Sequence, residues 1–196
     1  LDVLLTGLRR AAEASDPGAE TTILIVDDDP VVTLLLSQAL AAPGRHVRTS
    51  TNLAEAGEIL SREKISLLIL DIVLPDSDGR NLLARLRERP ETAALPILIL
   101  SGSISAQAKT ECFTLGADGF FEKPVDPAIF VSAATSLLAR ASETALEARR
   151  DALTNLPNRA AFHEAFGHAA ALAARNAEPL SIAILDLDRF KSVNDI

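Results

Sequence analysis

Carboxylates, a hydroxyl and a lysine stand at the ends of four apolar segments of this chain. Asp27 and Asp28 follow the segment 22–26, Asp71 follows 65–70, Ser101 follows 96–100, and Lys123 closes 117–122. In a parallel α/β sheet the carboxyl ends of the strands meet at one edge, where ligands bind. We therefore expect these five side chains to lie close together.

This set of residue types suits phosphoryl transfer. Three carboxylates in a small cluster repel one another, and a hard divalent cation such as Mg²⁺ relieves that repulsion. A lysine and a hydroxyl supply hydrogen-bond donors for phosphoryl oxygens. Asp71 is the expected nucleophile, which would form an aspartyl phosphate. For Asp71 considered alone, a solvated loop residue that merely ends a strand is an equally good interpretation.

Five apolar, strand-like runs alternate with helical patterns between residues 22 and 140. The runs are 22–26, 46–50, 65–70, 96–100 and 117–122, and the helices are expected from Pro30, after Asn52, over 79–89 and 105–115, and from Asp126 onward. Runs that are apolar on both faces are typical of a buried parallel sheet. The predicted fold is α/β, with a doubly wound five-stranded parallel sheet and right-handed crossovers.

Residues 21–140 resemble the receiver domain of two-component response regulators. The motif residues match one by one: Asp27 and Asp28 the acidic pair, Asp71 the phosphoacceptor, Ser101 the switch hydroxyl, Phe120 the switch aromatic, and Lys123 with Pro124 the lysine–proline pair. The resemblance implies a flavodoxin- or CheY-like strand order of 2-1-3-4-5. It also implies bound Mg²⁺, with the main-chain carbonyl of Val73 as a further ligand, and a cognate histidine kinase or phosphotransfer protein as partner. Phe120 stands where the family more often has Tyr, which removes a hydroxyl and keeps the ring.

A second group of polar residues follows an apolar run at 180–187, which we expect to be a buried strand. Residues 186–195 could form an ordinary surface turn. Together with 151–159, however, they resemble the opening third of a GGDEF diguanylate cyclase domain. The resemblance implies a partial α+β domain with these site residues: Asp186 and the carbonyl of Leu187 for Mg²⁺, Lys191 for phosphate, and Asn194 for guanine. Asn155 stands where that family usually has Gly, and Asn tolerates the left-handed backbone that the turn requires.

The expected organisation is an upstream helix and linker at 1–20, a receiver at 21–140, a helical linker at 141–150 and the truncated start of a GGDEF domain at 151–196. Spacings of four and three along the last receiver helix give a coiled-coil pattern of a and d positions, which favours a homodimer on activation. Burial in the chain's own domain explains the first half of that pattern equally well. Its residues are Phe130, Ala134, Leu137, Ala141, Thr144 and Ala148. Because the chain contains no Met, we expect it to be a segment of a longer polypeptide.

The composition limits the classes of partner. A net charge of −8 disfavours non-specific binding to nucleic acid or anionic membrane, and neither is an expected partner. The sequence shows no signal peptide and no apolar run near the roughly 20 residues that span a bilayer. The single cysteine, Cys112, cannot form an internal disulfide and is expected to be a small packed residue of a cytoplasmic protein.

The sequence therefore predicts a phosphorelay signal-transduction segment in which phosphorylation of Asp71 controls dimerisation. In the longer protein this would control synthesis of cyclic di-GMP from two GTP. The segment itself contains no GG(D/E)EF signature and is expected to be inactive, so whether it belongs to an enzyme stays open. Two alternatives remain: a non-catalytic interaction module with a degenerate cyclase, and a Mg²⁺-dependent phosphohydrolase that uses Asp186 and Asp188.

Overall fold

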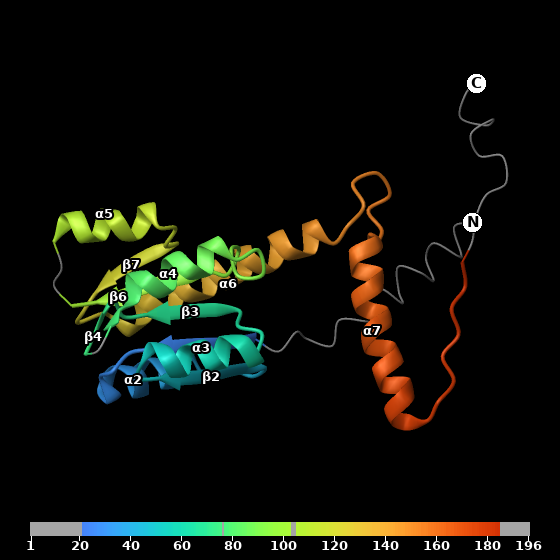
Figure 1. Cartoon of the computed structure of the whole chain (residues 1–196), viewed down its shortest axis with the longest axis horizontal. Helices are drawn as coiled ribbons and strands as arrows, with labels where there is room; N and C mark the ends of the chain where they lie inside the picture. Colours follow the sequence, from blue (N-terminus) through green and yellow to red (C-terminus); the bar gives the residue numbers. More distant parts are fainter. Residues whose placement is uncertain (1–20, 76, 103–104, 185–196) are drawn as a thin grey trace, which may run out of the picture. The chain divides into compact units, whose positions relative to one another are not determined.

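The computed structural model describes residues 21–75, 77–102 and 105–184 (Figure 1). The helix expected within residues 1–14 lies outside the described residues. The strands are β1 (Thr21–Val26), β2 (Arg45–Ser50), β3 (Leu67–Leu70), β4 (Val73–Leu74), β5 (Ser77–Asp78), β6 (Ile97–Ser101) and β7 (Gly119–Glu122). The helices are α2 (Pro30–Leu40), α3 (Leu53–Arg62), α4 (Gly79–Glu88), α5 (Ala106–Thr114), α6 (Pro127–Ala148) and α7 (Arg159–Asn176).

Five of the strands form one parallel sheet in the order β2-β1-β3-β6-β7. The central strand pairings place Ile23 of β1 beside Val47 of β2 on one side and Leu67 of β3 on the other. Counted along the chain, this is the order 2-1-3-4-5, so the predicted fold class and strand order are confirmed. β4 and β5 form a separate two-stranded antiparallel hairpin that the sequence pattern did not reveal.

Helices cover both faces of the sheet, which explains why its strands are apolar throughout. Side chains of α3, α4 and α5 pack on one face with Leu24, Leu68 and Ile99 of the strands. Side chains of α2 and α6 pack on the other face with Ile23, Ile25 and further residues of β3 and β6. This two-sided burial fixes the carboxyl ends of the strands, where the polar residues stand.

Polar caps set the helix starts that the sequence indicated. Asp29 accepts a hydrogen bond from Val31 N–H at the start of α2, where Pro30 occupies the first turn. Asn52 and Ser105 cap α3 and α5 in the same manner, through Glu55 N–H and Ala108 N–H. These caps satisfy backbone donors that have no partner within the helix.

The strand expected at 180–187 is wrong over residues 180–184. These residues form no strand, and Leu180, Ile182 and Ile184 are 44, 53 and 91% exposed. The physical reason is that a strand needs neighbouring strands for its backbone hydrogen bonds and a packed face for its side chains. No described residue pairs with this segment. Residues 185–187 lie outside the described part.

The coiled-coil pattern along α6 divides into two halves. Phe130, Ala134 and Leu137 are buried against the chain's own sheet. Thr144 and Ala148 are exposed, and Ala141 is half-buried. The first half is therefore explained by packing within the domain, and only the second half remains available for pairing between chains. α6 is continuous across the boundary expected at residue 140.

The described residues divide into two compact units, one up to residue 148 and the other over residues 149–184. In the second unit, the turn after Arg150 is held by Asp151 Oδ1, which accepts hydrogen bonds from Thr154 N–H at 2.9 Å and Thr154 Oγ1 at 2.7 Å. Asn155 has a φ of 55°, the left-handed conformation expected for this Gly-to-Asn position. Asn158 then caps α7.

Candidate functional site

Three carboxylates meet at the carboxyl edge of the sheet. One carboxylate oxygen from each of Asp27, Asp28 and Asp71 lies within 4.8 Å of the other two. Asp27 and Asp71 are buried and Asp28 is exposed, so the cluster is open to solvent on one side. Asp27 follows β1 and Asp71 follows β3, which are adjacent strands. The predicted convergence of these three residues is confirmed as a structural fact.

Lys123 joins two of these carboxylates. Its Nζ lies 2.7 Å from Asp27 Oδ2 and 2.6 Å from Asp71 Oδ2. Lys123 N–H donates to the carbonyl of Ser101, so the pairing of β7 with β6 extends to this residue and fixes its backbone. A cis peptide bond joins Lys123 to Pro124. The ammonium therefore stands over the phosphoacceptor candidate, at hydrogen-bond distance.

The electrostatics of the cluster favour a bound cation. Burial raises the pKa of Asp27 and outweighs the hydrogen bonds from Lys123 and Asp29 N–H, and the charge of Asp71 raises it further. Burial alone would lower the pKa of Lys123, but its hydrogen bonds and charge interactions with Asp27 and Asp71 raise it. One ammonium faces three carboxylates, so the site carries more negative than positive charge.

The remaining candidates lie around this cluster. Ser101 is fully buried, and its Oγ has no hydrogen-bond partner among the described residues. Val73 follows Asp71 by two residues, and its N–H donates to Asp71 Oδ1 at 2.9 Å. Phe120 is half-buried on β7, and Lys109 Nζ of α5 lies 5.1 Å from its ring centroid, within the range of a cation–π contact. Asp186, Lys191 and Asn194 lie outside the described residues.

A tight backbone contact joins the start of α4 to the phosphoacceptor candidate. Gly79 N–H donates to the carbonyl of Ile72 at 2.9 Å. A Cβ atom at Gly79 would lie 2.4 Å from the carbonyl oxygen of Asp71 and 2.9 Å from Ile72 Cα. Only glycine permits this approach, so α4 begins directly against the loop that carries Asp71.

An ionic bridge between α4 and α5 was not anticipated. Arg80 contacts Asp78 and Glu111, and Glu111 is 31 residues further along the chain. An (i, i+4) charge pattern would have been visible in the sequence, but a pair between two helices is set by tertiary packing. Cys112 is buried beside Glu111, which confirms it as a packed residue.

The residues present fit Mg²⁺. The ion prefers carboxylate, carbonyl and water oxygens in octahedral geometry, and it keeps several waters. Three carboxylates with an open side meet this requirement. The buried, unpartnered hydroxyl of Ser101 and the ammonium of Lys123 add donors suited to a phosphoryl group. Such a site can accept a phosphoryl group on Asp71 and stabilise it.

The fold and the site define a receiver domain. Residues 23–135 match the response regulator receiver domain family, and the chain belongs to that family. Residues 148–196 match the diguanylate cyclase, GGDEF domain family over a short, partial cyclase segment.

Curated relatives agree with this assignment. The chain is 36% identical over 123 residues to the transcriptional regulatory protein GltR of Pseudomonas aeruginosa. The matched residues make up 63% of this chain and 51% of the relative. It is 31% identical over 133 residues to the DNA-binding dual master transcriptional regulator RpaA of Synechocystis, covering 68% of this chain and 55% of the relative. The chain thus spans about half the length of these relatives. The absence of a nucleic-acid partner stays a prediction.

Solved structures show the same fold. A putative response regulator from Chloroflexus aurantiacus is 37% identical with a TM-score of 0.57, over 61% of this chain and 98% of the other. A CheY-like receiver domain protein from Methanospirillum hungatei is 25% identical with a TM-score of 0.60, over 64% and 99%. Within the described part of the chain, none of the helices has the length and apolar character needed to cross a membrane.

Proposed function

We propose that this chain is the phosphoaccepting segment of a two-component response regulator, with Asp71 as the residue that takes the phosphoryl group. The carrying observation is the cluster of Asp27, Asp28 and Asp71 with Lys123 Nζ 2.6 Å from Asp71 Oδ2. An unpaired structural aspartate would need neither two further carboxylates nor a buried lysine beside it.

In the transfer step, a carboxylate oxygen of Asp71 attacks the phosphorus of a phosphohistidine on the partner protein. The new P–O bond forms as the P–N bond breaks, and its electron pair returns to the imidazole nitrogen. Lys123 donates to the phosphoryl oxygens and offsets their charge. Asp27, Asp28, Asp71 and the main-chain carbonyl of Val73 would hold Mg²⁺, which would supply further charge neutralisation for the phosphoryl oxygens.

Ser101 reports the presence of the phosphoryl group. Its buried hydroxyl has no described partner, so a phosphoryl oxygen on Asp71 gives it an acceptor. Ser101 is the last residue of β6, and movement there passes to the connection toward α5. Phe120 on β7 follows this movement. The product of phosphorylation is therefore a changed surface around α5 and β7.

That surface promotes a two-fold dimer. In a longer protein with a complete cyclase domain, the dimer brings two GTP-binding half-sites together and controls formation of cyclic di-GMP. The partial GGDEF match and the exposed second half of α6 support this output. Here Asp186 is the metal-ligand candidate of the cyclase part, with Lys191 and Asn194 as nucleotide-binding candidates.

Phosphorylation can be tested directly by intact-mass measurement after incubation with acetyl phosphate and Mg²⁺. We expect the wild-type chain to gain one acid-labile phosphate and the Asp71→Asn variant to gain none. Stoichiometric phosphate on Asp71→Asn would show that the phosphoacceptor is another residue. A beryllofluoride complex of the wild type, absent in the variant, is the matching control.

A non-catalytic interaction module, in which the receiver only recruits partners, is the second candidate, because the receiver match covers residues 23–135 whereas the GGDEF match is partial. GTP turnover by a protein extended through a full cyclase domain separates the two. Turnover that rises with beryllofluoride supports the cyclase output. An extended protein with an intact signature that stays inactive with beryllofluoride supports the interaction module.

A further inference from the structure

Helix α5 is weakly anchored by apolar packing. Of its nine residues, only Cys112 is buried, whereas the neighbouring α4 buries Leu82, Leu83 and Leu86. Phe113 of α5 is 46% exposed. Elements with little buried apolar surface occupy the low-stability end of a fold and are the ones that move most readily. Polar contacts must therefore account for much of the attachment of α5.

An open groove of about 820 Å³ separates the exposed sides of α4 and α5. Asn81 and Ala84 line it from α4, and Gln107, Thr110 and Thr114 line it from α5. Because the groove is open, it leaves room for a change in the distance between the two helices.

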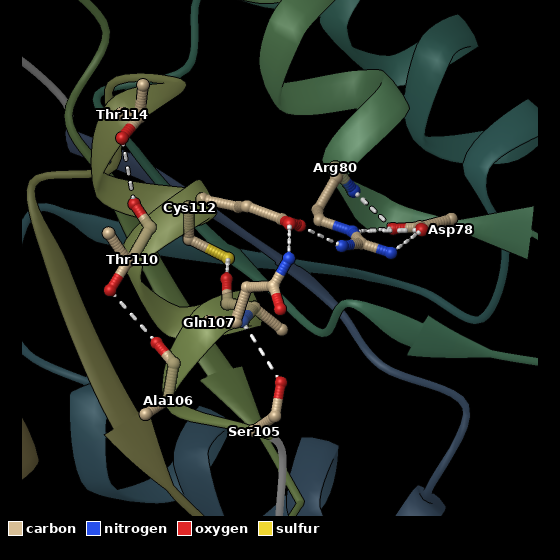
Figure 2. Close-up of polar contacts among 10 residues, drawn as sticks. Asp78, Arg80, Ser105, Ala106, Gln107, Thr110, Cys112 and Thr114 are labelled. Atoms are coloured by element: carbon tan, nitrogen blue, oxygen red, sulfur yellow. Dashed lines mark hydrogen bonds and ion pairs between the residues drawn. The ribbon is translucent and has the colours of Figure 1, made fainter.

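One ionic contact bridges this groove. Arg80 Nη1 lies 2.5 Å from Glu111 Oε2, and Arg80 also pairs with Asp78 through Nε and Nη2 (Figure 2). The Arg80 side chain is 34% exposed and that of Glu111 44%. The pair is thus partly shielded from solvent and geometrically well formed, but it is still open to screening.

Arg80 is attached to the loop of the phosphoacceptor. Asp78 caps α4 by accepting a hydrogen bond from Arg80 N–H at 2.9 Å. The next residue, Gly79, donates its N–H to the carbonyl of Ile72, directly after Asp71. The ionic bridge therefore connects α5 to the same backbone segment that carries Asp71.

A second arginine holds the turn that follows α5, five residues after Glu111. Arg87, in the last turn of α4, donates from Nε to the carbonyl of Gly116 at 2.9 Å and from Nη1 to the carbonyl of Leu95 at 2.8 Å. Its Nη2 pairs with Asp118 at 3.0 Å. The bond to Gly116 fixes the turn that follows α5, so we expect a movement of α5 to pivot about that turn.

We propose that Arg80 is a positioning residue, whose ion pair with Glu111 latches α5 in the unphosphorylated arrangement. The inference rests on the proposed function, in which Asp71 is phosphorylated and Ser101 moves toward the phosphoryl group. That movement of Ser101 displaces the start of α5, and α5 pivots about the turn after it that Arg87 holds. The Arg80–Glu111 contact breaks in this step. The free energy of the Arg80–Glu111 contact is therefore part of what the phosphoryl group must offset before α5 moves.

The latch makes a prediction about affinity for a phosphoryl mimic. A contact present only in the unphosphorylated arrangement lowers the apparent affinity of any ligand that requires the other arrangement. We expect Glu111→Gln and Arg80→Met each to raise the affinity for beryllofluoride with Mg²⁺ by roughly two- to fivefold, the range for a partly exposed ion pair. The measurement is a titration of the whole chain followed by ¹⁹F NMR.

A double-mutant cycle separates the latch from general damage to the fold. The double variant should bind no more tightly than the single variants, because both substitutions remove the same Arg80–Glu111 contact. Arg48→Met is the matched control, since Arg48 forms a comparable ion pair with Glu63, at 2.6 Å, on the β2 edge of the sheet. It should leave the affinity unchanged. A merely structural role for Arg80 predicts weaker binding in the variants.

The two proposals fail in different ways. Equal or weaker binding by Glu111→Gln, or additive effects in the double variant, would overturn the latch alone. Failure of the wild-type chain to bind beryllofluoride at Asp71, with Asp71→Asn behaving identically, would overturn the proposed function. Faster amide exchange in α5 of Glu111→Gln without beryllofluoride is expected in addition, and an unchanged rate would count against the latch.

Discussion

The carboxylate of Asp27 is kept in a position that costs stability when no cation is present. It is 1% exposed, and burial raises its pKa despite the nearby ammonium of Lys123. The pKa of Asp27 is higher in the folded protein than in the unfolded chain, where it is about 3.9. Ionisation of Asp27 therefore does not lower the free energy of unfolding below the unfolded pKa, and it lowers that free energy fully above the folded pKa. At pH 7 the ionised Asp27 therefore destabilises the metal-free fold.

We expect Asp27→Asn to raise the free energy of unfolding without Mg²⁺ by about 1 kcal/mol, the usual size of a single-residue effect, because the substitution removes the charge and keeps one side-chain oxygen as a hydrogen-bond acceptor. The added stability that Mg²⁺ gives the wild type should be lost. Urea denaturation with and without Mg²⁺ measures both. The difference in the free energy of unfolding between the variant and the wild type should shrink as the pH falls through the folded-state pKa of Asp27.

Asp28→Asn provides the matched control, since Asp28 belongs to the same cluster and is exposed. Its substitution should also reduce stabilisation by Mg²⁺, but it should not raise the metal-free stability, because little desolvation is relieved. A metal-free Asp27→Asn that is clearly less stable than the wild type would contradict this account of the site.

At the scale of elements, the junction between Asp71 and α4 is the most constrained part of the domain. Gly79→Ala would place a Cβ against the backbone of Asp71 and Ile72, where nothing flexible can yield. We expect a loss of about 1–3 kcal/mol in the free energy of unfolding, typical of overpacking, together with a lower yield of phosphorylated Asp71. Urea denaturation and intact mass are the measurements.

Gly57→Ala is the control for the intrinsic effect of the substitution. Gly57 lies inside α3, and a Cβ built there meets nothing within 4 Å beyond its chain neighbours and the backbone of its own helix. Because alanine favours a helix over glycine, this variant should gain about 0.5–1 kcal/mol. Equal gains in both variants would show that the close approach of α4 to Asp71 is not a constraint.

At the scale of the whole molecule, the output depends on assembly. Since Phe130 and Leu137 are buried in the domain, the coiled-coil pattern of α6 can pair only through its second half, where Leu146 is 45% exposed. Ile129, off that pattern in the first half, is 62% exposed and adds to the surface formed by α5 and β7. We expect beryllofluoride to shift the chain from monomer to dimer in sedimentation velocity, and Asp71→Asn to remain monomeric. An unchanged monomer at high micromolar concentration would rule out phosphorylation-dependent dimerisation.

The amino-acid sequence by itself determined the strands of the receiver sheet and the positions of Asp27, Asp28, Asp71, Ser101 and Lys123 at its edge, and the order of the strands came from the resemblance to receiver domains. Buried parallel strands and capped helices leave local signals, because each element buries its own apolar residues and satisfies its own backbone donors. The left-handed backbone at Asn155 was also predicted from the residue type alone, because Asn tolerates that conformation.

Other features were decided only by the tertiary structure. Residues 180–184 have the apolar character of a strand, but strand pairing is non-local and no described segment pairs with them. The short β4–β5 hairpin and the Arg80–Glu111 bridge likewise depend on which surfaces the packing brings together. Periodicity identifies the face that a segment buries, whereas its partner is set by long-range contacts that no local pattern records.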